Sequence, residues 1–150
     1  MEEFQIRPAV KQDQGTIRRL VNEARINPMG LDWERFWVAE TSGEVIGCCQ
    51  MKPHRDGSSE LASLVVQPDW RGQGVARALV DHFLSAQQEK IYLTCRTDLG
   101  GFYRAFGFRE VAVEDMPRYF RTVYRFINAG KLVGREGLRI LVMVFDQSQS

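Results

Sequence analysis

Apolar residues recur along the chain at two spacings, one typical of strands and the other of helices. Short apolar runs bounded by turn residues predict strands over residues 4–8, 36–40, 45–51, 61–66, 91–95, 109–113 and 138–145. Apolar positions three and four residues apart predict helices over residues 13–25, 75–84, 99–106 and 117–130. Residues 31–36 fit either a short helix or a loop. The mixture predicts a single α/β domain over residues 1–150.

Size and charge narrow the class of protein. The chain has 150 residues, 44% of them hydrophobic and 26% charged, which is typical of one globular domain. A formal net charge of +1 gives no whole-protein field for nucleic acid. No apolar run approaches the roughly 18 residues that span a bilayer, and the amino terminus has no signal-peptide pattern. We therefore expect a cytoplasmic protein with neither a nucleic-acid nor a membrane partner.

The cysteines and histidines do not form a recognisable chemical site. Cys48 and Cys49 are neighbours in a predicted strand, so their side chains point to opposite faces and cannot pair. Cys95 lies in another predicted strand, and no spacing to His54 or His82 resembles a zinc site. We expect buried thiols and no metal. A cysteine nucleophile stays open, although the sequence offers it no positioned base.

The segment from residue 60 to residue 80 combines three features that suit a bound phosphate. A buried strand over residues 61–66 leads through Arg71-Gly72-Gln73-Gly74 into a helix that begins at Val75. The glycines permit positive φ and close approach of a ligand, and the helix N-terminus offers free N–H groups and a positive dipole end. A P-loop is excluded because the required lysine is missing. A dinucleotide fingerprint is excluded because Arg77 replaces its third small residue.

The pattern Val66-x-Pro68-x-x-Arg71-Gly72-x-Gly74-Val75-Ala76 resembles the signature of the GNAT superfamily of acetyl-CoA-dependent N-acetyltransferases. A second segment, Tyr103-x-x-x-Gly107-Phe108, resembles another hallmark of that family, a short helix after the fifth strand. The family usually carries Asn seven residues before that tyrosine, where this chain has Arg96. The resemblance covers residues 4–115. It implies about seven mostly antiparallel strands, splayed between strands four and five, with helices on both faces.

The resemblance also implies a cofactor site for acetyl-CoA. Its backbone amides would hold the pyrophosphate, and the end of the central strand would bind the thioester and pantetheine. The residues carried over are Leu64, Val65, Val66, Arg71, Gly72, Gln73, Gly74, Val75, Ala76 and Tyr103. We call residues 71–76 the cradle. For Arg71 the alternative is a solvated charge at a helix start.

Two side chains are candidates for proton transfer. Glu60 precedes the central strand by the spacing at which some GNAT enzymes place a catalytic glutamate, so it is the candidate base. Tyr103 matches the tyrosine that faces the cofactor sulfur and is the candidate acid. Alternatively, Glu60 is exposed at the start of a strand, and Tyr103 is a core aromatic. A reaction without any single base also stays open.

The predicted helix over residues 117–130 is the chain's individual feature. Its charged residues are all basic, and Arg118, Arg121 and Arg125 share one face; Lys131 and Arg135 follow. The face is either a solvated surface, a lid that pairs with substrate carboxylates, or a nucleic-acid contact.

Together these features predict an acyltransferase that moves acetyl from acetyl-CoA to a primary amine by direct attack in a ternary complex. The acceptor is a small molecule or a peptide, and a homodimer is possible. The alternatives are transfer of a longer acyl group and a catalytically silent acyl-CoA-binding module that regulates a partner.

Overall fold

The computed structural model describes residues 3–129 and 139–147. The chain divides into two compact units. Unit 1 comprises Met1–Lys52 and Leu61–Gln87, and unit 2 comprises Pro53–Glu60 and Gln88–Ser150. Strand β4 (Ser59–Val66) contributes its first two residues to unit 2 and the remainder to unit 1.

The described strands hydrogen-bond in the order β1-β2-β3-β4-β5-β7-β6. The pairs β1–β2, β2–β3, β5–β7 and β6–β7 are antiparallel. In contrast, β4 and β5 pair in parallel, with Glu60 opposite Tyr92 at the start of both strands. The prediction of a seven-stranded, mostly antiparallel sheet is confirmed for the described residues.

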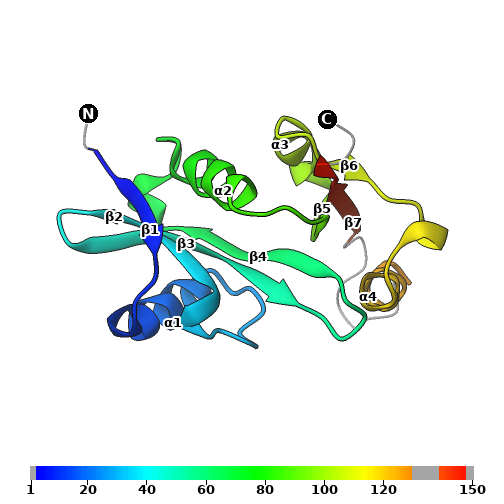
Figure 1. The fold of residues 1–150 in the computed structure, drawn as a ribbon, viewed down its shortest axis with the longest axis horizontal. Helices are drawn as coiled ribbons and strands as arrows, with labels where there is room; N and C mark the ends of the chain where they lie inside the picture. Colours follow the sequence, from blue (N-terminus) through cyan, green and yellow to red (C-terminus); the bar gives the residue numbers. More distant parts are fainter. Residues whose placement is uncertain (1–2, 130–138, 148–150) are drawn as a thin grey trace. The chain divides into compact units, whose positions relative to one another are not determined.

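Unit 1 carries one helix on each face of its strands (Figure 1). It contains β1 (Gln5–Pro8), α1 (Gln14–Glu23), β2 (Phe36–Thr41), most of β3 (Glu44–Pro53) and α2 (Val75–Ser85). Gly47 of β3 lets α2 pack closely, because a Cβ there would lie 3.2 Å from the Val75 and Leu79 side chains and 3.0 Å from the Val65 carbonyl oxygen. This packing against β3 holds α2, the helix that follows the cradle, in place.

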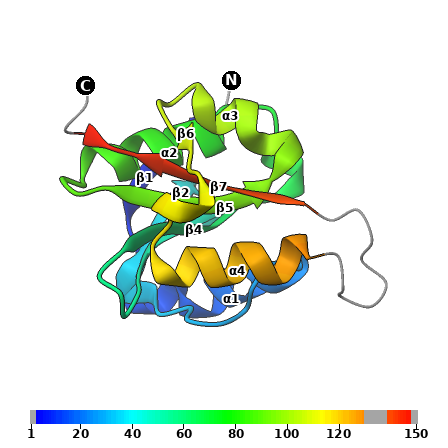
Figure 2. The same ribbon diagram turned by 90° about the vertical axis from the view of Figure 1, so that its right-hand side faces the viewer.

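Unit 2 also has a helix on each face of its strands (Figure 2). It contains β5 (Ile91–Arg96), α3 (Gly100–Arg104), β6 (Arg109–Glu110), α4 (Arg118–Asn128) and β7 (Ile140–Phe145). The core under α4 comprises Val111, Met116, Phe120, Val142 and Val144. Phe120 is fully buried, so α4 is anchored by its apolar face.

Several boundaries differ from the predictions. The helix expected over 99–106 is the five-residue α3, preceded by a 3-10 turn at Thr97–Leu99, and no Thr97 or Asp98 side chain caps it. The sixth strand has only two residues, because a second 3-10 turn follows at Val113–Asp115. Residues 31–36 contain a 3-10 turn, Trp33–Arg35. The predicted stop at Gly130 and the basic residues Lys131 and Arg135 lie outside the described residues.

The three thiols are buried and unpaired, as expected. Burial raises the pKa of Cys48 to about 12 and that of Cys95 to about 11, and it also raises the pKa of Cys49 well above its usual value. Thiolate nucleophiles are therefore disfavoured at neutral pH. Over residues 3–129 and 139–147, no helix has the length and apolar character to cross a membrane.

Candidate functional site

The cradle is a turn between β4 and α2 in unit 1. Gly72 and Gly74 adopt φ values of +78° and +86°, which residues with a Cβ rarely adopt. A Cβ at either glycine would meet nothing within 4 Å. Glycine is therefore required by the positive φ, and not by a lack of space. Gly74 is the residue before α2, and its carbonyl oxygen accepts the first helical bond, from Ala78 N, at 3.0 Å. The turn leaves open space above a helix N-terminus.

Two side chains of the turn bond to its own backbone. Arg71 Nε donates to the carbonyl oxygen of Val66 at 3.2 Å, and Gln73 Nε2 donates to the carbonyl oxygen of Asp69 at the same distance. The interpretation of Arg71 as a purely solvated charge is therefore incomplete, because its guanidinium closes the turn onto the end of β4. Such local bonds order the loop before a ligand binds.

The centre of β4 departs from regular strand geometry at Ser63, whose φ is +57°. Such a conformation costs a non-glycine residue on the order of 1–3 kcal/mol and is often found at functional sites. Ser63 is held by Gln50, whose Nε2 donates to the Ser63 Oγ at 2.8 Å, and by the Cys48 Sγ, which contacts its carbonyl oxygen at 3.5 Å. The distortion directly precedes Leu64, the first of the predicted thioester-binding residues.

The candidate thioester-binding residues lie beyond this distortion. Val65 and Val66 are buried, and Leu64 is half-buried. Val75 is buried against β3, while Ala76 is half-buried on α2. Unit 1 thus brings all nine of the predicted cofactor residues other than Tyr103 onto one strand–turn–helix segment.

Glu60, the candidate base, is buried at the start of β4, with 8% of its surface exposed. Its Oε1 lies 2.7 Å from Nε2 of His54, and each side chain is about 10% exposed. The alternative of an exposed glutamate at a strand start is wrong, because the loop over residues 53–59 folds back and covers it. The carboxylate faces an imidazole rather than bulk water.

Helix α4 contacts the loop that carries His54, within unit 2. The His54 ring stacks on Tyr119, with centroids 3.6 Å apart and an interplanar angle of 17°, and meets Phe120 edge-on at 5.5 Å. The Asp56 Oδ2 accepts a hydrogen bond from the backbone N–H of Tyr119 at 2.9 Å, so the loop caps the helix. Burial, together with the charge of Glu60, raises the pKa of Tyr119. We call Glu60, His54, Asp56, Tyr119 and Phe120 the Glu60 site.

Tyr103, the candidate acid, lies on α3 and is 9% exposed. Its ring contacts Phe102 and Phe108 edge-on, with centroids 5.1 and 5.8 Å away. Its carbonyl oxygen accepts bonds from the backbone N–H groups of Phe106 and Phe108, which closes the turn at Gly107. The ring is therefore fixed in an aromatic cluster, a setting that suits either of the two roles considered for it.

Arg96, which stands where the family usually has asparagine, forms an ion pair with Asp98. Its Nε and Nη2 donate to the two carboxylate oxygens of Asp98 at 3.2 and 3.0 Å. Both side chains are about two-thirds exposed, so this pair contributes at most about 1 kcal/mol to stability.

The basic face of α4 is less uniform than its sequence indicates. Arg121 is half-buried and donates through Nη2 to the carbonyl oxygen of Met116 at 2.9 Å. Arg118 and Arg125 are exposed. Two arginines of α4, not three, therefore present their charge to solvent.

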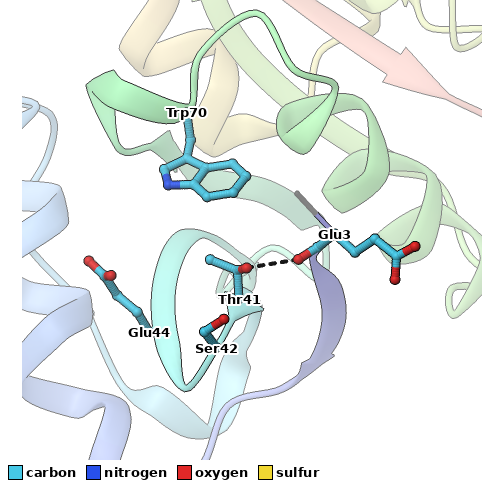
Figure 3. Close-up of a pocket in the computed structure, with 5 residues that line it drawn as sticks. All are labelled: Glu3, Thr41, Ser42, Glu44 and Trp70. Carbon is cyan, nitrogen blue, oxygen red and sulfur yellow. Dashed lines mark hydrogen bonds between the residues drawn. The ribbon is translucent and has the colours of Figure 1, made fainter. Parts of the chain in front are cut away.

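A polar hollow of about 580 Å³ lies elsewhere in unit 1 and contains none of the predicted site residues (Figure 3). It is lined by Glu3, Thr41, Ser42, Glu44 and Trp70, and Thr41 Oγ1 donates to the Glu3 carbonyl oxygen at 2.8 Å. Its two carboxylates make it unsuited to an anionic cofactor. In the part of the chain that the structure describes, no group of three or more His, Cys, Asp or Glu side chains is placed to hold a metal.

Sequence reasoning missed two features of these sites, His54 and Ser63. His54 has one available signal, since it stands six residues before Glu60 at the other end of a turn-rich loop. That loop closes through His54 N and the Ser58 carbonyl oxygen at 2.9 Å. Ser63 has none, because serine is not a residue that marks positive φ.

Known proteins resemble this chain in sequence. A family model described as an acetyltransferase (GNAT) domain matches residues 32–110, more than half of the chain. An uncharacterised N-acetyltransferase of Chlorobaculum tepidum is 31% identical over 88 residues, which are 55% of each chain. An amino-acid acetyltransferase of Vibrio vulnificus is 26% identical over 105 residues, which are 67% of this chain and 23% of that protein. The chain therefore spans about half the length of the first relative and about a quarter of the length of the second.

Solved structures share the fold. N-acetylglutamate synthase from Neisseria gonorrhoeae, in complex with coenzyme A and N-acetyl-glutamate, superposes with a TM-score of 0.70 at 22% identity. The match covers 95% of this chain and 35% of that one. The family match across residues 32–110 includes β4, the cradle and α3, which carry the two motifs. The chain belongs to the GNAT acetyltransferase family.

Proposed function

We propose that this protein transfers an acetyl group from acetyl-CoA to a primary amine. The observation that carries the proposal is the cradle: two left-handed glycines between a buried strand and a helix N-terminus, with open space above both. Backbone N–H groups in that arrangement bind phosphate oxygens. Relatives named as an N-acetyltransferase and as an amino-acid acetyltransferase support the assignment.

The cradle residues fit a pyrophosphate. The open space above Gly72 and Gly74 leaves the backbone accessible, and the Arg71 and Gln73 side chains already hold the turn. In this assignment Arg71 to Ala76 bind the phosphates, while Leu64 to Val66 orient the acyl end. Acetyl-CoA would supply an activated thioester carbonyl.

The protein's own groups would manage the protons. Glu60 takes a proton from the acceptor's ammonium group, directly or through water, so that the neutral amine can attack. The new C–N bond forms as the C–S bond breaks, and Tyr103 gives a proton to the departing sulfur. The attacking nitrogen loses its second proton as the amide forms, and that proton restores the Tyr103 phenol, directly or through water. Direct attack in a ternary complex needs no covalent enzyme adduct, which agrees with the raised pKa values of the three buried thiols.

For the acceptor we propose an amino-acid-like amine that carries a carboxylate. Arg118 and Arg125 are exposed on α4 and are available to such a group. One relative described above is named an amino-acid acetyltransferase, and one protein of the same fold is an N-acetylglutamate synthase in complex with N-acetyl-glutamate. We also propose that one catalytic domain spans residues 1–150 in the cytoplasm. A homodimer stays a prediction.

The test is a calorimetric titration with acetyl-CoA, followed by an assay of thiol release with a panel of amines. The panel should pair each amino acid with its amide, so that the contribution of the carboxylate is read directly. Binding with release on some amines supports the proposal, and preference for free carboxylates supports the acceptor class. Binding without release on any amine favours the silent module, and absence of binding contradicts the cradle assignment.

A further inference from the structure

The candidate base of this protein is not an isolated carboxylate. Glu60 and His54 form one buried pair with an Oε1–Nε2 distance of 2.7 Å. A buried carboxylate needs a hydrogen-bond donor or a positive partner, since burial alone disfavours its charged form. The imidazole is a partner of this kind.

The imidazole is held in place by a segment outside the matched family domain. That domain ends at residue 110, whereas α4 begins at Arg118. Tyr119 stacks on the His54 ring at 3.6 Å, and Phe120, fully buried, closes its edge. The bond from Tyr119 N to Asp56 Oδ2 ties the same helix to the loop that carries His54. Two contacts thus hold the ring itself, and a third holds the loop that carries it.

We propose that His54 is a positioning residue for Glu60, and that the two side chains act as one proton-accepting unit whose geometry is set by α4. This inference rests on the proposed function for its role in turnover. The contact geometry that carries it belongs wholly to unit 2. It assigns to α4 a task that the sequence did not indicate.

The proton balance of the unit is simple. With His54 neutral and Glu60 ionised, the pair carries one negative charge and shares one N–H. Removal of a proton from the acceptor's ammonium leaves a neutral amine and brings the pair to zero net charge, with the added proton on either partner. Release of that proton to solvent restores the pair. No bond other than those to hydrogen changes.

The titratable groups around His54 come from four segments. Glu60 lies on β4 and Asp56 on the same loop as His54; Tyr119 lies on α4. Tyr92 of β5 pairs with Glu60 in the sheet and contacts Phe120 at 5.3 Å. Of these groups, Glu60, Asp56 and Tyr119 interact with the imidazole directly, while Tyr92 reaches it only through Phe120 and Glu60.

The experiment compares pH–rate profiles of the full chain with three variants. His54→Phe keeps a ring to stack on Tyr119 but removes the hydrogen bond, and His54→Gln keeps a donor but does not titrate. His82→Phe is the matched control, because His82 also contacts an aromatic ring, edge-on to Trp37 at 4.7 Å, and belongs to unit 1 rather than to the unit that contains the pair. Melting temperatures are recorded for each protein.

We expect His54→Phe to lower kcat by about tenfold and to move the acidic limb to higher pH, because the carboxylate loses a donor while it stays buried. His54→Gln should restore much of the limb's position, and His82→Phe should match the wild type. An unshifted limb in His54→Phe, with turnover and melting otherwise altered, overturns the inference, since a merely structural role lowers stability without moving the limb.

A second measurement tests the pair without turnover. Imidazole ring signals are recorded by NMR in the wild type and in Glu60→Gln. Loss of the carboxylate should change the chemical shifts of the His54 ring, because its Nε2 lies 2.7 Å from Glu60 Oε1, and leave those of the His82 ring unchanged. Identical His54 signals in both proteins overturn the pair even if acetyl transfer is observed. Absence of turnover with changed His54 signals counts against the proposed function alone.

Discussion

The two ends of β4 lead into sites of opposite construction. At its C-terminal end, Val66 precedes a turn whose glycines have open space around them. At its N-terminal end, Glu60 is covered by a loop and a helix. The first site is built from backbone that one segment supplies by itself. The second is built from side chains of three segments that packing brings together.

This difference predicts how each site responds to substitution. In the proposed function the cradle binds phosphate through N–H groups, so changes of exposed side chains should matter little there, whereas an added Cβ or charge at a glycine should matter greatly. The proposed role of Glu60 depends on a buried hydrogen bond, so loss of either partner leaves the other buried without it, at a cost in free energy. The predictions below test that contrast, beginning with the largest effect.

Gly74→Asp should weaken acetyl-CoA binding by at least about 100-fold. The substitution forces a side chain onto a φ of +86° and places an anion where phosphate is expected. Calorimetry gives the dissociation constant. Gly43→Asp is the matched control, since Gly43 has a φ of +81° and also has open space at its Cβ, but lies in the β2–β3 turn. Equal affinities in the two variants would refute the cradle.

Glu60→Gln should lower kcat by about 100-fold near neutral pH and flatten the acidic limb of the rate profile. The amide has nearly the same volume, so binding of acetyl-CoA should be unchanged. Steady-state kinetics across pH measure both effects. Glu89→Gln, at an exposed position, serves as the control. An unaltered profile in Glu60→Gln would return this residue to a structural role.

Tyr103→Phe should lower kcat by about tenfold, with little change in affinity for acetyl-CoA. The phenyl ring keeps the edge-on contacts with Phe102 and Phe108, so the variant removes the hydroxyl alone. A phenol with pKa near ~10 can protonate a thiolate of pKa near ~8.5. Stopped thiol-release assays measure turnover. Wild-type turnover in the variant would leave Tyr103 as a core aromatic.

The contrast between the sites also explains what the sequence could reveal. The cradle was predictable because positive φ at two positions demands glycine, and a strand and a helix flank them within one short segment. Glu60 was found as a candidate, but its environment was not. Its cover depends on Tyr119, whose backbone bonds to Asp56 across 63 positions of sequence. Periodicity within one segment carries no signal for such a contact.

Two misjudged elements have the same origin. The helix predicted over 99–106 is only the short α3. A 3-10 turn precedes it at Thr97–Leu99, and Gly107, with a φ of +105°, lies in the turn that follows it. The sixth strand is short because a 3-10 turn follows it at Val113–Asp115. In both cases a 3-10 turn stands at one end of the predicted element, and the spacing of apolar residues does not indicate such a turn.

The smallest expected effect concerns the cap that Asp56 supplies to α4. Asp56→Ala removes the acceptor of the Tyr119 N–H, which should lower the free energy of unfolding by about 0.5–1 kcal/mol at neutral pH. The lower part of the usual capping range applies because Asp56 is exposed. Chemical denaturation measures the change. Asp81→Ala, an exposed aspartate in the middle of α2, is the control.

The same cap should show a pH dependence of fixed sign. Partial burial raises the pKa of Asp56, but hydrogen bonds from Ser58 and from the Tyr119 amide outweigh it, so the net pKa lies below its usual value near 3.8. A carboxyl whose folded-state pKa is lowered stabilises the protein above its unfolded-state pKa and loses that contribution as pH falls through the folded value. The stability gap between wild type and Asp56→Ala should therefore be constant from pH 7 to about pH 5 and narrow below about pH 4. A gap that widens on acidification would mean that Asp56 is not held by these donors, and that α4 covers Glu60 without its help.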